Sequence, residues 1–283
     1  MLTSYQYYIK LISSIACPVV LLWVGGASKN FMMKYIFLLS LLLTCVYAPV
    51  CAQNVIPMKN EPAQLAVTYR MSFPDKGKKP GPPDSEAFLQ KMDQLLADLT
   101  FTLHVGRTQS AFFSAYVFDE TDPIEQVAKK ISQAGNSYYF DAVQQALLMQ
   151  VSTLGTEEFL QDDTELTWEV HPGKEKEING LTCYYATGER KSSGWEPTQI
   201  DAWFTKDYPV PFGPADFHGL PGLIVQVQGG GAMYKATQIK QLAGDQVTID
   251  MPEVKAKDLM LRSEFLGKMQ QVVPAPPKSK GKQ

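Results

Sequence analysis

The segment Asp207–Gln228 reads DYPVPFGPADFHGLPGLIVQVQ and holds four prolines and three glycines ahead of an apolar run that starts at Leu223. Proline fixes φ at about −65°, whereas glycine permits positive φ and close backbone approach. These residue types predict a rigid corner that leads into a strand at Leu223–Gln228. The alternative interpretation of Gly219-Leu220-Pro221-Gly222 is a backbone cradle that presents amide donors to an anion or a peptide. A phosphate loop is excluded because no Lys-Ser/Thr follows and the next element is a strand.

Alternation of apolar and polar residues predicts strands on both sides of this corner. In Gln64–Phe73 every second side chain is apolar, which is typical of a half-buried strand. The sequence Gly229-Gly230-Gly231 predicts the turn that follows the Leu223–Gln228 strand. The predicted strands are Gln64–Phe73, Thr100–Val105, Ala111–Phe118, Ser137–Phe140, Ala146–Val151, Leu166–Val170, Leu181–Thr187, Gln199–Thr205, Leu223–Gln228, Met233–Leu242 and Val247–Met251.

Helix signals occur at three places. Ser85 is placed to cap a helix that carries apolar residues at helical spacing up to Leu99. Asp122-Pro123 supplies a cap and a proline at the first helical position, and we expect this helix to end at Gly135. Asp258–Val272 predicts a closing helix.

Together these elements predict a mainly β (α+β) fold. Short turns join most of the strands, so we expect a largely antiparallel sheet. An alternating strand needs a cover on its apolar face, which a curved sheet wrapped over two or three helices provides. Such a half-barrel resembles the periplasmic lipoprotein carriers, with helices filling the concave side.

The start of the chain has the anatomy of a secretory signal peptide. Met33 and Lys34 precede an apolar run, and small residues end at Ala52. We expect residues 33–52 to be removed before Gln53, and the protein to be exported to the periplasm or to associate with the outer membrane. Residues 1–32 are interpreted as an upstream extension of the reading frame, with a membrane hairpin as the alternative. Membrane contact is expected only through the uncleaved leader.

Two cysteines in the leader raise the question of lipid attachment. Neither Cys45 nor Cys51 follows a small residue, so lipidation is disfavoured. Only Cys183 lies in the mature chain, which excludes an internal disulfide there.

The remaining chain fits one β-rich domain at 53–272 and a Pro/Lys-rich tail at 273–283 that we expect to be disordered. The net charge of the whole chain is −3, which argues against nucleic acid as a partner.

Several motifs spread along the chain carry a family resemblance. They are Ser110 and Phe112 at the end of a strand, Leu166-Thr167-Trp168, Lys176–Cys183 with Ala186, Ala202–Thr205 with Tyr208-Pro209-Val210, Phe212-Gly213-Pro214 with Phe217, and the hexapeptide GLPGLI at 219–224. These motifs resemble the GLPGLI family of Bacteroidota-type envelope proteins, with a Porphyromonas-type domain. The resemblance covers about residues 64–270 and implies an envelope location, but it implies no reaction, cofactor or site residue.

Cys183 and the Asp216/His218 pair are the candidate catalytic groups. A cysteine nucleophile needs a nearby base and an exposed site. No sequence feature pairs Cys183 with His104, His171 or His218, although a fold that brought Cys183 to Asp216 and His218 would create a hydrolase-like triad. The favoured interpretation is a buried cysteine and a loop histidine, so no catalytic residue is assigned. A hydrolase or thiol enzyme remains an alternative.

Metal binding has little support in the sequence. The histidines and Cys183 show no ligand spacing, and the methionines are dispersed at positions typical of a core. We therefore expect no metal ligand and no cofactor, and keep a metal-handling periplasmic protein as a further alternative.

The aromatic residues favour an aromatic-rich core over the helices, with an apolar groove on the concave face of the sheet as the alternative. We predict an exported envelope protein without enzymatic activity that binds a partner protein or an apolar ligand. The predicted binding residues are Trp203, Phe204, Phe212, His218, Gly219, Leu220, Pro221 and Gly222.

Overall fold

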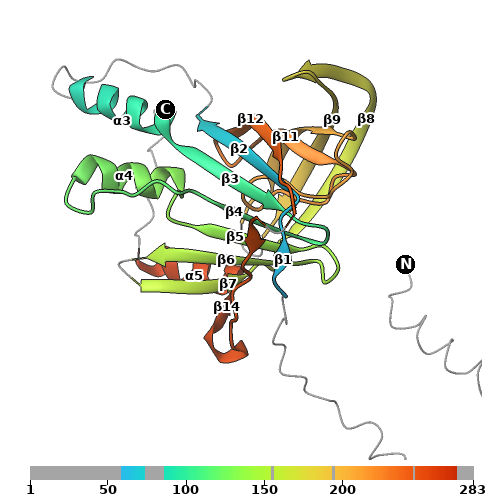
Figure 1. Cartoon of the computed structure of the whole chain (residues 1–283). Coiled ribbons are helices and arrows are strands. Elements are labelled where there is room, and N and C mark those ends of the chain that lie inside the picture. The colour runs from blue at the N-terminus through green and yellow to red at the C-terminus, as the bar shows by residue number, and fades with distance from the viewer. Residues whose placement is uncertain (1–58, 74–85, 154–155, 193–194, 245, 273–283) are drawn as a thin grey trace, which may run out of the picture. The chain divides into compact units, whose positions relative to one another are not determined.

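The described part of the chain is built around one large open sheet (Figure 1). The computed structural model describes residues 59–73, 86–153, 156–192, 195–244 and 246–272. The predicted leader at 1–32 and 33–52, the predicted helix cap Ser85 and the predicted tail at 273–283 lie outside these residues. None of the described helices combines the length and hydropathy that a membrane crossing requires.

Twelve strands form the sheet in the order β14-β7-β6-β5-β4-β3-β2-β12-β11-β10-β9-β8. All neighbours pair antiparallel except β14 and β7, which confirms the predicted antiparallel fold class. A separate ladder joins β1 and β13. The strands are β1 (Glu61–Pro62), β2 (Leu65–Ser72), β3 (Thr100–Val105), β4 (Gln109–Phe113), β5 (Ser137–Asp141), β6 (Ala146–Thr153), β7 (Thr156–Gln161), β8 (Glu165–Ile178), β9 (Leu181–Lys191), β10 (Thr198–Thr205), β11 (Leu223–Gly229), β12 (Ala232–Gln241), β13 (Thr248–Ile249) and β14 (Leu259–Leu261).

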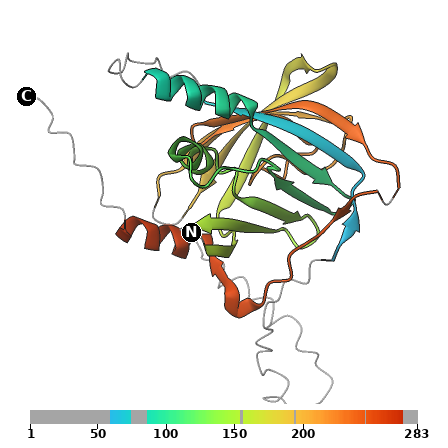
Figure 2. The same cartoon turned by 60° about the vertical axis from the view of Figure 1, so that its left-hand side comes forward.

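The sheet curls around the loop between β10 and β11, here called the Gly/Pro loop (residues 206–222). Trp168 of β8 donates from Nε1 to the carbonyl of His218 at 2.8 Å. Phe140 of β5 stacks on the ring of His218 with 3.9 Å between ring centroids. Seven strands separate β5 from β8 in the sheet, so both can reach one residue only if the sheet is strongly curved (Figure 2).

Part of the concave side is therefore filled by the Gly/Pro loop, where helices alone were expected. Phe212, Phe217 and Leu220 of this loop are buried in the main hydrophobic core. The core also takes one face of β2, whose residues alternate between buried and more exposed from Leu65 to Met71. This alternation confirms the half-buried strand predicted there.

Three α-helices accompany the sheet: α3 (Glu86–Asp98), α4 (Pro123–Ser132) and α5 (Arg262–Val272). Asp122 caps α4 as predicted, because its side chain accepts a hydrogen bond from the amide of Ile124. The expected end at Gly135 is wrong. Gln133 adopts the left-handed conformation (φ 54°) and closes the helix two residues earlier.

The closing helix begins later than the predicted Asp258. A short 3-10 turn (Ala256–Asp258) and strand β14 precede it, because Leu259–Leu261 pair with β7. The side chain of Asp163 then accepts hydrogen bonds from the amide and hydroxyl of Ser263, which fixes the first turn of α5. Strand β7 itself was not predicted, since its sequence TEEFLQ lacks clean alternation.

Candidate functional site

Backbone hydrogen bonds hold the Gly/Pro loop in its conformation. The amides of Gly219, Leu223 and Ile224 donate to the carbonyls of Pro211, Tyr208 and Phe212 at 2.9, 2.9 and 3.0 Å. The amide of Gly219, one of the predicted cradle residues, is therefore engaged within the loop, and the other two bonds tie the loop to the start of β11.

Backbone conformation and close packing explain why glycine occupies two positions of this loop. Gly219 has a φ of 95°, which disfavours other residue types. A Cβ at Gly222 would lie 2.2 Å from the carbonyl oxygen of Thr205, so no side chain fits where the loop rejoins the sheet.

Asp216 is the electrostatic centre of the loop. Its Oδ2 lies 2.9 Å from Nη1 of Arg190 on β9 and 2.8 Å from Nη1 of Arg262 on α5. Arg262 also donates to Asp162 at 3.1 Å. Burial alone would raise the pKa of Asp216, but the two guanidinium groups lower it to about 2. The carboxylate is therefore charged and joins three separate elements of the fold.

His218 does not pair with Asp216. No hydrogen bond joins the two side chains within the described residues, since Asp216 is committed to the arginines. Burial against Phe140 lowers the pKa of His218 to about 4, so the ring is neutral at pH 7. An Asp/His dyad of the kind predicted as an alternative is thus not assembled here.

Cys183 lies apart from both residues. It is buried opposite Thr205, and its thiol donates to the carbonyl of Leu181 at 3.4 Å. Burial raises the pKa of this thiol. Over the described residues no hydrogen bond links Cys183 to a histidine, and the fold does not bring Cys183, Asp216 and His218 together as a triad.

The predicted binding residues are divided between the two faces of the sheet. Phe204, Phe212 and Leu220 are buried in the core, and Gly222 is buried beside them. His218 is half-buried, whereas Gly219 and Pro221 are exposed. These residues form no single open groove in the structure, and their role in binding stays a prediction.

Trp203 occupies the opposite face from Phe204. Its ring lies 5.0 Å from that of Tyr185, and the ammonium of Lys176 sits 4.1 Å above it. Alternation along Gln199–Thr205 could have revealed this division, since adjacent strand residues point to opposite faces.

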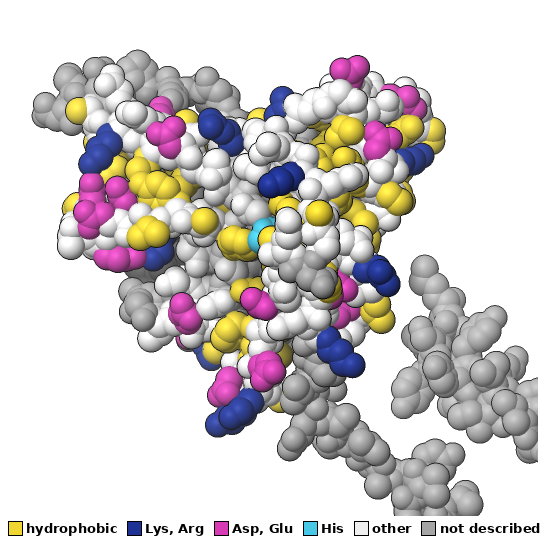
Figure 3. All heavy atoms as spheres, in the orientation of Figure 1, with side chains coloured by type: hydrophobic (Ala, Val, Ile, Leu, Met, Phe, Trp, Pro, Cys, Tyr) yellow, Lys and Arg dark blue, Asp and Glu magenta, His cyan; other side chains and the backbone are white. Residues whose placement is uncertain are grey.

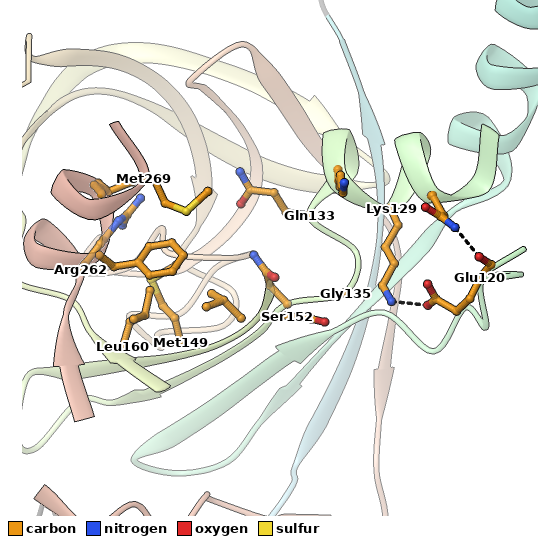
Figure 4. A pocket seen from close by; sticks show the side chains of 15 residues that line it. Glu120, Lys129, Gln133, Gly135, Met149, Ser152, Leu160, Arg262 and Met269 are labelled. Atoms are coloured by element: carbon orange, nitrogen blue, oxygen red, sulfur yellow. Dashed lines mark hydrogen bonds and ion pairs between the residues drawn. The ribbon is translucent and has the colours of Figure 1, made fainter. Parts of the chain in front are cut away.

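A pocket of about 640 Å³ lies between α4 and α5, over strands β6 and β7. Figure 4 shows Arg262 and Met269 on one side and Gln133 and Lys129 on the other. The apolar part of the lining consists of Met149, Val151, Leu160, Phe265, Leu266 and Met269, and the rest of Glu120, Gln126, Lys129, Lys130, Gln133, Gly135, Asn136, Ser152 and Arg262.

This pocket was not predicted from the sequence. Only one signal pointed to it: Phe265 and Met269 are four residues apart and share a face of α5. The other walls come from distant segments, whose meeting depends on the β14–β7 pairing. The ion pair between Lys129 and Glu120, at 2.6 Å, closes the α4 side.

The described residues contain no group of three or more His, Cys, Asp or Glu side chains that could hold a metal ion.

Comparisons with known proteins give limited results. Two solved structures of PNGF-II are similar: one, in a C2 space group, is 12% identical with a TM-score of 0.41, covering 73% of this chain and 32% of that one. The other, in a P21 space group, is 14% identical with a TM-score of 0.39, covering 64% of this chain and 29% of that one. The chain thus spans about a third of the length of these structures. No curated protein is similar in sequence.

Membership of the GLPGLI family remains a prediction. Residues 189–226, which include Arg190, Asp216 and the hexapeptide at 219–224, match the model of a family described as a protein of unknown function (Porph_ging).

Proposed function

We propose that this chain is an exported envelope protein that binds an apolar ligand in the pocket between α4 and α5. The pocket itself carries the proposal. Its volume of about 640 Å³ lies within the roughly 300–1,000 Å³ of small-molecule sites, and an apolar wall forms one part of its lining. The signal-peptide pattern at 33–52 supports export.

The floor of the pocket is preformed. Met149 and Val151 of β6 and Leu160 of β7 are buried, so they are held in place by the core. Phe265 and Leu266 on α5 are half-buried and complete the apolar wall. A ligand entering here would remove these two side chains further from water, which favours binding by about 25 cal/mol for each Å² buried.

The alternatives with Cys183 or the Asp216/His218 pair have less support. The thiol has a raised pKa, and Asp216 is occupied by two arginines. A role for the chain in binding needs none of these groups to react.

Leu266→Trp tests the proposal, because the larger side chain would fill the pocket. We expect it to abolish binding of a fluorescent apolar probe such as 1-anilinonaphthalene-8-sulfonate and to remove any ligand seen by native mass spectrometry of protein purified from envelope extract. Val143→Trp, at a residue that is 74% exposed and outside the pocket lining, is the matched control. Equal binding by both variants would refute the pocket as the site.

A second candidate function is docking of an envelope protein partner on α3 and α4. Phe88 and Leu89 of α3 and Ile131 of α4 are more than 40% exposed. Figure 3 shows hydrophobic side chains on the side of the molecule where α3 and α4 lie. Exposed apolar patches of this kind mark interaction surfaces. Leu89→Asp with Ile131→Asp would abolish cross-linking to such a partner, whereas Leu266→Trp would leave it intact.

A further inference from the structure

The charged residues that line the pocket are mostly cationic. Lys129, Lys130 and Arg262 face a single carboxylate, that of Glu120, which gives the lining a net charge of +2. Glu120 is already paired with Lys129, and Arg262 is paired with Asp162 and Asp216, which do not line the pocket. Lys130 is therefore the lining cation that has no carboxylate partner among the described residues, and it is complementary to an anionic group.

Arg262 lines the pocket and has hydrogen-bond donors that are not used by its two ion pairs. Both of its hydrogen bonds, to Asp162 and Asp216, use Nη1. Nε and Nη2 have no partner within the described residues. The side chain is 19% exposed and is held by the two carboxylates, so its remaining donors are already oriented. Guanidinium groups bind carboxylates through two such donors in a fixed fork.

Lys130 adds a second cation across the pocket. It lies in the last turn of α4, is exposed, and has no ion-pair partner among the residues that the structure describes. Its ammonium can move to meet an anionic group, because its stem is flexible.

We infer that the ligand of this pocket is an amphiphile with a carboxylate head, of the fatty acid class. The inference rests on the proposed function and names its ligand class. The acyl chain lies along Met149, Leu160 and Phe265, and the carboxylate accepts hydrogen bonds from Arg262 with Lys130 nearby.

Dodecanoate and dodecanol, compared by displacement of a fluorescent probe at pH 8, test this inference. Both carry the same chain, so their difference isolates the carboxylate. We expect dodecanoate to bind about 10-fold more tightly or better, as for a hydrogen bond to a charged group. Lys130→Gln and Arg262→Lys each reduce this preference, whereas Lys240→Gln, at an exposed lysine on β12 outside the pocket lining, leaves it unchanged.

The outcomes separate the two claims. Equal affinity for acid and alcohol overturns the carboxylate inference and leaves the apolar pocket standing. Failure of both ligands to displace the probe overturns the proposed function as well. Arg262→Lys keeps a cation beside Asp216, and a circular dichroism melt verifies its fold. Lys130→Gln touches no buried group, so a preference that survives in this variant and in Arg262→Lys also overturns the inference.

Discussion

Arg262 donates from Nη1 to Oδ2 of Asp216 at 2.8 Å, although 46 residues separate them in the chain. The same carboxylate oxygen accepts from Arg190. One buried carboxylate thus joins the first residue of α5, strand β9 and the Gly/Pro loop. Removing one member of a buried ion pair leaves the others charged and without compensation.

Asp216→Asn is therefore expected to lower the free energy of unfolding by about 3–5 kcal/mol, measured by urea denaturation at pH 7. Asp258→Asn, at an exposed carboxylate, is the control and changes stability by less than about 0.5 kcal/mol. The folded pKa of about 2 is depressed, so this contribution is present above the ordinary pKa of about 4 and is lost as the pH falls toward 2. A variant as stable as the wild type would contradict the assignment.

His218 predicts a second pH dependence. Its folded pKa of about 4 lies below the unfolded value of about 6.5, so the unfolded state binds the proton first. Stability contributed by the neutral ring is complete above pH 6.5 and falls by about 3 kcal/mol as the pH drops to 4. His218→Phe keeps the stacking on Phe140 and removes this slope in denaturation series, whereas His171→Gln retains it. An unchanged slope in His218→Phe would count against the buried neutral ring.

Gly222→Ala tests the close approach of the Gly/Pro loop to β10. The added Cβ would lie 2.2 Å from the carbonyl oxygen of Thr205, a clash with backbone that only a shift of the loop relieves. Overpacking of this kind costs about 1–3 kcal/mol in unfolding free energy. Gly267→Ala is the matched control, since nothing lies within 4 Å of its Cβ and it sits in α5. We expect that control to be neutral or up to about 1 kcal/mol more stable.

Cys183 is expected to react slowly with 5,5′-dithiobis(2-nitrobenzoate) in the folded protein and rapidly in 6 M guanidinium chloride (a concentration of about the strength that unfolds even stable domains). The thiol is fully buried, and burial raises its pKa, so little thiolate is available at pH 7. Cys183→Ala supplies the blank for other thiols in the chain. Rapid labelling of the native protein would instead indicate an exposed, activated thiol.

Local patterns predicted most of the elements but not the site. Alternation identified β2 and β3, and Asp122-Pro123 identified the start of α4, because these signals act within a few residues. The end of α4 was missed because Gln133 adopts positive φ without being glycine. Residue type alone does not indicate that a glutamine will adopt positive φ at a helix end.

The pocket could not be predicted because its walls are far apart in sequence. Met149 and Phe265 meet only after β14 has paired with β7 and placed α5 over the sheet. The aromatic residues predicted to bind a ligand are close in the sequence, but the structure separates them. Trp203 and Phe204 are neighbours in the chain, yet the strand sends them to opposite faces, one toward Lys176 and the other into the core.

The order of the strands has a consequence for how the chain acquires its structure. Strands β2 to β7 form one meander and β8 to β12 another, and the two meet only where β2 pairs with β12. That seam joins Tyr69 to Ala236, so the middle of the sheet is completed only after nearly the whole domain has been synthesised. Until then both meanders expose an open edge in the middle of the future sheet. Such long-range closure is slow, and it leaves the edges of β2 and β12 open to mispairing until the two strands have met.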